Sequence, residues 1–363
     1  MALNSTIGAC ALLLITGASQ RMSAWSQRVS RHSWISTPIY IALFLVVLFV
    51  LDLPWSIYAQ YIREGQYGLT EQAFSGWLRD RLVGLAVGVV LGSLVLTIIY
   101  AAVRRTGASW WQWATGLVFI FLMFNVLIGP VYILPLFNAY TPLPDGPARE
   151  AVLSLARANR VPTDHVEWFD ASKQTTRISA NVAGFLNTTR IALNDNLMNK
   201  TSLPEIKAVL GHEMGHYVLN HSFKLLISLT LVIGLALGLL HRAFDWSLAR
   251  WGGRLGLAGR ADPAGLPLAL ALISVIFFLL TPIENSITRG VEAEADAFGL
   301  NAAREPQAWA MAAMRLSTYR KIRPGAFEEF VFYDHPSGYE RVHGAMIWLK
   351  ENPTATAEAA PPQ

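Results

Sequence analysis

Residues 82–103, LVGLAVGVVLGSLVLTIIYAAV, decide the fold class, because they hold no charged residue before Arg104. A helix of about 20 apolar residues rises about 30 Å, which is the thickness of the hydrocarbon core of a bilayer. We therefore expect this segment to cross a membrane. Pro130 and Pro135 predict a kink or a helix end in a later span. Four further segments have the length and apolar character of spans, namely residues 38–58, 113–137, 222–243 and 266–288.

Composition excludes several classes of protein. Hydrophobic residues make up 53% of the 363 residues and charged residues 15%, where a soluble domain has about 25% charged residues. This apolar excess excludes a disordered chain and argues against an ordinary soluble enzyme. The net charge of +4 fits arginines at membrane edges better than a nucleic-acid-binding surface. Cys10 is the only cysteine, so an intrachain disulfide and a cysteine-based zinc site are excluded.

The spans divide the chain into alternating apolar and polar segments. Two spans separate the two polar segments, so both emerge on the same side of the membrane and can build one domain. The first contains an amphipathic pattern at residues 148–160 and short β-prone runs at residues 165–193. The predicted order is an N-terminal segment with a possible partial span at 5–18 (1–36), three spans (37–137), a polar segment (138–221), two spans (222–288), a second polar segment (289–350) and a disordered tail (351–363).

The strongest chemical signal is His212-Glu213-Met214-Gly215-His216. On a helix, residues four apart lie on one face, so two imidazoles can hold one zinc ion at ~2.0–2.1 Å. Glu213 can then act as the general base for the attacking water. Ser202 and Glu205 form a Ser-x-x-Glu capping box that predicts the start of this helix, which we expect to continue into the span at 222–243. The alternative is a pair of surface histidines.

A third ligand has two candidates in the sequence. His221 misses the metzincin spacing, which needs a histidine at position 222, and we interpret it as a polar residue at the membrane edge. Glu292 follows the last span on the same side of the membrane, and a carboxylate completes a His₂Glu site with one open position. Asp296 lies one turn later and can accept the free ring N–H of a ligating histidine. The alternative for Glu292 and Asp296, as for Glu294, is a solvated acidic helix face.

Taken together, these motifs resemble the type I CAAX prenyl proteases, integral-membrane zinc endopeptidases, over residues 36–350. The matching segments are Arg63-Glu64-Gly65-Gln66-Tyr67-Gly68-Leu69, Pro135-Leu136-Phe137-Asn138, His212-Glu213-x-x-His216, Arg289-x-x-Glu292-x-x-Ala295-Asp296 and Asp334-His335-Pro336-Ser337 with Arg341. The resemblance implies that Glu292 is the third zinc ligand and Asp296 its partner, that His335 stabilises the oxyanion and that Arg341 lines the cleft. It also implies a substrate-binding edge strand at Ser179-Ala180-Asn181, where the family typically has Asn-Ala-Tyr.

The sequence therefore predicts a mainly α, multi-span membrane protein with a small α+β zincin-like metalloprotease domain built from two chain segments. We expect one zinc ion per chain, with His212, His216 and Glu292 as ligands and Glu213 and His335 as catalytic residues. The resemblance implies removal of the C-terminal tripeptide from prenylated proteins. The alternatives are a quality-control endopeptidase for membrane proteins and, more distantly, a transport or binding protein with a structural zinc, against which Glu213 argues.

Localisation follows from the spans and the resemblance together. The spans predict an integral membrane protein in contact with the lipid bilayer, in a bacterial inner membrane or a membrane of endoplasmic-reticulum type. Lysines and arginines flank both ends of the spans equally and do not choose an orientation. The resemblance implies an active site that faces the cytoplasm. A peptide or protein substrate is the expected partner, nucleic acid is not, and the oligomeric state stays open.

Overall fold

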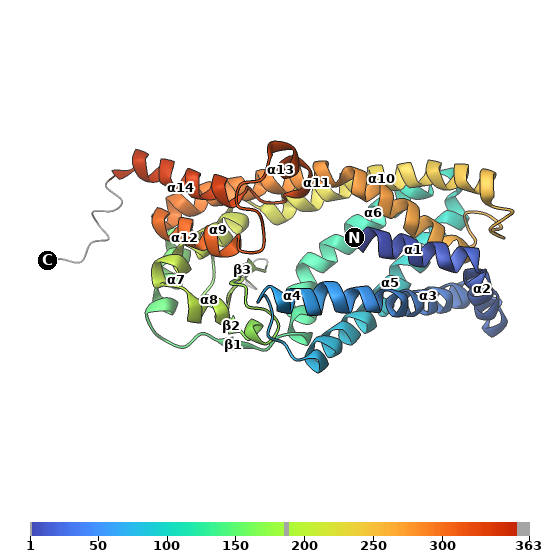
Figure 1. Ribbon diagram of the computed structural model, residues 1–363, viewed down its shortest axis with the longest axis horizontal. Helices are drawn as coiled ribbons and strands as arrows, with labels where there is room; N and C mark the ends of the chain where they lie inside the picture. The colour runs from blue at the N-terminus through green and yellow to red at the C-terminus, as the bar shows by residue number, and fades with distance from the viewer. Residues whose placement is uncertain (1, 185–188, 354–363) are drawn as a thin grey trace. The chain divides into compact units, whose positions relative to one another are not determined.

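The computed structural model describes residues 2–184 and 189–353. These residues are mainly helical (Figure 1). The chain divides into two compact units that each draw on several chain segments. The first unit comprises Met1–Glu64, Ala73–Met123 and Ile227–Thr281, and the second comprises Gly65–Gln72, Phe124–Leu226 and Pro282–Gln363.

A helix forms the main part of each of the five predicted spans. The helices are α3 (Ser33–Ile57), α5 (Phe74–Thr106), α6 (Trp110–Ile128), α10 (His221–Trp251) and α11 (Leu266–Ala303). Helices α5 and α6 belong to one apolar stretch and are separated at Gly107, where φ is 58°. Glycine adopts this left-handed conformation without steric cost, so α5 ends there. The stretches long and apolar enough to cross a membrane are Ser33–Gln66, Phe74–Leu136, His221–Trp251 and Pro263–Ala303.

The prolines of the third predicted span act as expected. Helix α6 ends at Ile128, directly before Gly129 and Pro130. A π-helical turn (Gly129–Ile133) and a 3₁₀ turn (Leu134–Leu136) follow. Proline lacks the backbone N–H that an α-helix needs and clashes with the preceding turn, which explains the change in geometry.

The N-terminal segment forms two helices rather than one. Helix α1 (Ala2–Ile15) confirms a helix near 5–18, and its 14 residues are fewer than a span needs. The polar sequence of helix α2 (Ala18–Val29) did not indicate a packed helix. Its buried face consists of small serines, and the hydroxyls of Ser19 and Tyr40 share a hydrogen bond of 2.7 Å. Small size, and not hydrophobicity, makes this face suitable for packing.

The second unit contains a small four-stranded sheet. Its strands β1, β2, β4 and β3 lie side by side in that order. Strands β2 and β4 are parallel, and the other two pairs are antiparallel. Strand β3 is therefore an edge strand, in which Asn181 pairs with Ala192 of β4. The bounds are β1 (Tyr140–Pro142), β2 (Val166–Phe169), β3 (Ala180–Ala183) and β4 (Arg190–Asn194).

Helices of the second unit share the core of this sheet. Ile191 and Leu193 of β4 belong to one buried cluster with Leu210 and Met214 of α9 (Leu203–Val218). Helix α7 (Pro147–Ala158) and the strands confirm the helix at 148–160 and the strands within 165–193. Residues 354–363 of the predicted tail lie outside the described residues. The other helices are the short α4 (Arg63–Gln66), α7 (Pro147–Ala158), α8 (Asp195–Lys200), α12 (Pro306–Leu316), α13 (Ala326–Phe332) and α14 (Gly338–Glu351).

Helix α9 begins as predicted and ends earlier than expected. The Ser202 hydroxyl accepts a hydrogen bond from the Glu205 N–H (3.5 Å), and the Glu205 carboxylate accepts one from the Ser202 N–H (2.8 Å), so the capping box is confirmed. The expectation that this helix continues into the next span is wrong, because α9 and α10 are separate helices. Asn220 adopts φ 56° between them, a left-handed conformation that asparagine tolerates better than most residues.

Candidate active site

Small residues bring α9 and the last part of α11 into close contact. A Cβ atom added to Gly299 would lie 2.7 Å from the backbone nitrogen of His212. A Cβ atom added to Gly215 would lie 3.1 Å from Cα of Ala295. The backbones can approach this closely because neither helix carries a bulky side chain at these positions. The contact explains why Gly211 and Gly215 occur in a helix whose intrinsic stability they lower.

His212 is held on two sides. Its ring stacks on Trp309 of α12, with centroids 5.1 Å apart and planes at 19°. Its Nδ1 atom lies 2.8 Å from Oδ1 of Asp296. A carboxylate only accepts hydrogen bonds, so we assign a proton to Nδ1 of His212. Its Nε2 atom is the one that faces the other predicted ligands.

His216 presents the same nitrogen to the same place. Its Nε2 atom lies 3.1 Å from Nε2 of His212 and 3.5 Å from Oε1 of Glu292. Oε2 of Glu292 lies 3.3 Å from Nε2 of His212. One ligand atom from each of these three residues lies within 4.8 Å of the other two. The helical spacing of the histidines and the position of Glu292 on α11 thus bring three donors together.

These three donors favour a cation at the point where they meet. Burial opposes a charge on His212, but the carboxylates of Asp296 and Glu292 outweigh it and raise the pKa of His212 to about 9. Burial, together with His212, lowers the pKa of His216 to about 4, so this ring is neutral at pH 7. Two imidazoles and a carboxylate are a donor set that fits zinc with an open coordination position.

Gly299→Ala should disrupt this arrangement, because the added Cβ meets the backbone of His212 and not a side chain that could move aside. We expect destabilisation by about 1–3 kcal/mol, as in other overpacked cores, together with weaker metal binding. Thermal unfolding and metal analysis of the purified variant measure both effects. The matched control is Gly290→Ala on the same helix, where nothing lies within 4 Å of the added atom. Equal behaviour of the two variants would contradict the close-contact explanation.

Glu213 has no hydrogen-bond partner among residues 2–184 and 189–353. Burial raises the pKa of Glu213 to about 7, and the charge of Glu292 adds to this effect, while His212 opposes it. The carboxyl group is therefore not committed to another side chain. A carboxyl group whose pKa lies near neutral pH is suited to accept and return a proton.

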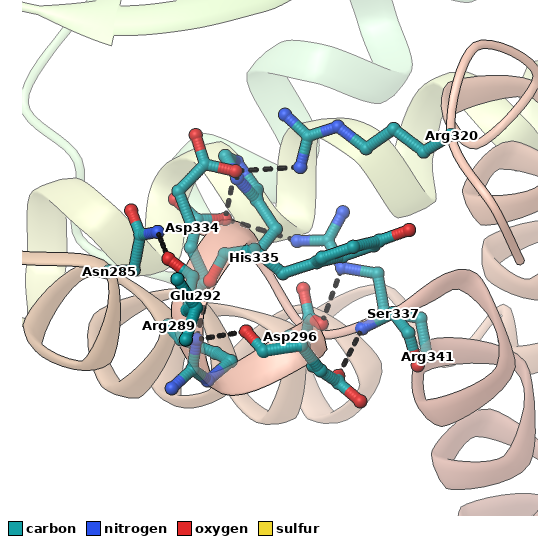
Figure 2. Close-up of polar contacts among 12 residues, drawn as sticks. Asn285, Arg289, Glu292, Asp296, Arg320, Asp334, His335, Ser337 and Arg341 are labelled. Atoms are coloured by element: carbon teal, nitrogen blue, oxygen red, sulfur yellow. Dashed lines mark hydrogen bonds and ion pairs between the residues drawn. The ribbon is translucent and has the colours of Figure 1, made fainter. Parts of the chain in front are cut away.

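Two residues from the C-terminal segment contact Glu292 (Figure 2). Nη2 of Arg341 donates a hydrogen bond to Oε2 of Glu292 (3.0 Å), and its Nε atom lies 3.0 Å from Oδ2 of Asp296. Nε2 of His335 lies 3.3 Å from the same Glu292 oxygen. Arg341 is buried against the two carboxylates, whereas the side chain of His335 is 38% exposed. The structure therefore adds His335 and Arg341 to the cluster of predicted site residues His212, His216, Glu292 and Asp296.

The loop that carries His335 is fastened by further polar contacts. Asp334 lies 3.0 Å from Nδ1 of His335 and accepts a hydrogen bond of 2.6 Å from Arg320. The contact with His335 lowers the pKa of Asp334. Arg289 of α11 donates to the backbone carbonyl of Tyr333, directly before this pair. These contacts orient the ring of His335 toward Glu292.

The predicted substrate segment Ser179-Ala180-Asn181 leads into the edge strand β3. Asn194 clamps Ser179 from the β4 side, since its side chain accepts from the Ser179 N–H (3.1 Å) and its N–H donates to the Ser179 carbonyl (2.9 Å). Ala180 and Met214 belong to one core cluster, so β3 packs against α9. The strand thus lies beside the helix that carries the two histidines.

Three residues near the site have contacts that the sequence did not indicate. His221 begins the helix of a predicted span, but its side chain is only 1% exposed and its Nδ1 atom lies 3.0 Å from Nδ1 of His216. The second residue is Glu294, whose carboxylate lies 3.1 Å from the other ring nitrogen of His221. The third residue is Trp309, which lies on a separate helix from the motif that it supports. Asn220 was the one signal in the sequence for the break between α9 and α10.

Two family models match adjoining parts of the chain. The family model of Peptidase family M48 matches residues 142–347. The model described as CAAX prenyl protease N-terminal, five membrane helices, matches residues 2–139. The two matches meet where the chain passes from its first apolar helices to the sheet.

Individual relatives extend the similarity over most of the chain. The chain is 28% identical to the uncharacterized metalloprotease YhfN of Bacillus subtilis, over 92% of this chain and 79% of that protein. It is 28% identical to the CAAX prenyl protease 1 homolog of Oryza sativa, over 81% and 69% of the two chains. The crystal structure of S. mikatae Ste24p matches with a TM-score of 0.73 and 25% identity, over 85% of this chain and 75% of that chain. The chain therefore belongs to peptidase family M48, and it is a membrane metalloendopeptidase that resembles the CAAX prenyl proteases.

Proposed function

We propose that the metal of this endopeptidase is zinc, bound one ion per chain by His212, His216 and Glu292. The observation that carries this proposal is the convergence of the two Nε2 atoms and the Glu292 carboxylate within 3.5 Å of one another. Nitrogen and carboxylate ligands with one open position are typical of catalytic zinc. Asp296 fixes the ring of His212, and Arg341 links Asp296 to Glu292.

The protein groups around the metal have separate roles in peptide hydrolysis. A bound zinc ion would acidify the attacking water and polarise the scissile carbonyl. Glu213 accepts the proton of that water and then returns it to the leaving amine, for which its raised pKa is suited. His335 is the proposed partner of the oxyanion, because its partly exposed ring lies beside Glu292 and next to Asp334. It can donate through Nε2 only in the form that carries a proton on both ring nitrogens, with Nδ1 facing Asp334.

The edge strand β3 is the proposed substrate platform. A peptide can add antiparallel to an edge strand through backbone hydrogen bonds, which do not depend on its side chains. Residues 179–181 lead into this strand, and Asn194 holds the backbone of Ser179. Arg341 is buried on Glu292 and Asp296, so we propose that it shapes the cleft through these carboxylates.

We further propose that the substrates are prenylated protein tails, by analogy with the relatives named CAAX prenyl protease 1. The test compares cleavage of a farnesylated C-terminal peptide with that of the same peptide lacking the lipid, by the full chain in detergent. We expect kcat/KM to be higher for the farnesylated peptide. Equal rates for both peptides would contradict a prenyl requirement and favour a quality-control endopeptidase that uses the same site.

The orientation of the site is testable with topology reporters. Two spans lie between the polar segments 138–221 and 289–350, so both segments share one side, which we propose to be the cytoplasm. A reporter fused after Lys350 should report the cytoplasm, and one placed in the loop at 252–262 between α10 and α11 should report the opposite side. Reports from the same side would contradict the assignment of α10 and α11 as spans. Opposite sides in reversed order would retain the site and exclude cytosolic tails as substrates.

A further inference from the structure

We propose that His221 is a positioning residue that fixes the ring of His216 for metal binding. The inference rests on the zinc site proposed above. His221 opens α10 directly after the break at Asn220, and its side chain is 1% exposed. Its ring lies against that of His216, with centroids 5.1 Å apart. Buried polar groups need hydrogen-bond partners, and both nitrogens of His221 have one.

The partners of His221 determine which nitrogen of His216 is free. Nε2 of His221 lies 3.1 Å from Oε2 of Glu294, and a carboxylate only accepts, so this nitrogen donates. A neutral imidazole has one N–H, so Nδ1 of His221 is an acceptor. It lies 3.0 Å from Nδ1 of His216, which must therefore donate. The lone pair of His216 is then on Nε2, the nitrogen that faces His212 and Glu292.

The two proposed histidine ligands, His212 and His216, are thus oriented by different kinds of partner. Asp296 contacts the remote nitrogen of His212 directly, at 2.8 Å. The remote nitrogen of His216, Nδ1, instead contacts His221, whose other nitrogen contacts the carboxylate of Glu294. Glu294 is half exposed and pairs with Lys224 at 2.6 Å. The neighbouring carboxylates of α11 already bring two negative charges to a buried site. His221, placed between His216 and Glu294, supplies orientation without a third carboxylate in direct contact with the two histidines.

The direct test measures the zinc dissociation constant of the purified full chain by competition with a chelator. His221→Phe keeps a ring of similar size and removes both nitrogens, whereas His221→Asn places an amide oxygen near the former Nδ1 atom. We expect zinc binding to weaken ~10–100-fold in the Phe variant, the usual loss for such a partner, and to stay close to that of the wild type in the Asn variant. Unchanged affinity in the Phe variant, or equal weakening in both, would overturn the proposal.

A surface variant tests the contact between His221 and Glu294 in case His221→Phe does not fold. Glu294→Ala removes the acceptor of His221 at a half-exposed position, so folding should be preserved. We expect weaker zinc binding than in the control Asp145→Ala, which breaks the ion pair with Arg149 in the same unit. Equal zinc affinity of these two variants would overturn the proposal that Glu294 orients His216 through His221. Absence of zinc from the wild-type protein would instead contradict the proposed zinc site itself.

Discussion

Glu213→Gln is expected to lower the kcat of peptide cleavage by roughly 10²–10⁴-fold, the usual contribution of a general base. Glutamine has nearly the same shape but cannot accept the proton of the attacking water. The substitution leaves the three proposed ligands in place, so zinc content should stay at the wild-type level and KM should change little. Steady-state kinetics and metal analysis on the same preparation measure these quantities.

The control for this variant is Glu150→Gln, an exposed glutamate on α7, a helix that carries none of the proposed site residues. It should cleave at the wild-type rate. An active Glu213→Gln enzyme with full zinc content would exclude Glu213 as the base. An inactive variant without zinc would show that Glu213 acts in metal binding and not in proton transfer.

Glu292→Ala is expected to abolish stoichiometric zinc binding, with cleavage lost in proportion. The carboxylate supplies one of three proposed donors, and its removal also leaves Arg341 and His335 without the acceptor that they share. The buried Arg341 then keeps only Asp296 as a carboxylate partner. A buried charge with poorer pairing is costly, so a loss of thermal stability should accompany the loss of metal. His212→Ala and His216→Ala should lose zinc in the same way.

Metal analysis of these variants distinguishes ligands from neighbours. Glu150→Ala serves as the matched control, because it removes an exposed carboxylate outside the site. If Glu292→Ala retained one zinc ion per chain, the third ligand would have to be another residue.

The parts of the fold that could be predicted depend on local patterns. The capping box at Ser202 and Glu205, the apolar run at 82–103 and the proline at 130 each act on their own neighbourhood, and each appears in the structure as expected. The spacing of the two histidines is equally local, since a helix brings residues four apart onto one face. The prediction for Glu292 depended on the position of its motif after the last span.

The parts that could not be predicted depend on contacts between distant elements. His221 contacts His216 across the break at Asn220 that separates α9 from α10. Trp309 reaches His212 from α12, and no periodic pattern connects the two positions. Helix α2 was missed because its buried face is made of serines, which a hydrophobicity pattern cannot detect.

The most direct test of the central claim is anomalous X-ray scattering at the zinc absorption edge from crystals of the wild-type protein. The account predicts a single strong peak per chain, at about 2.0–2.2 Å from Nε2 of His212, Nε2 of His216 and a carboxylate oxygen of Glu292. A peak bound by other residues, or one from which Glu292 is absent, would contradict it.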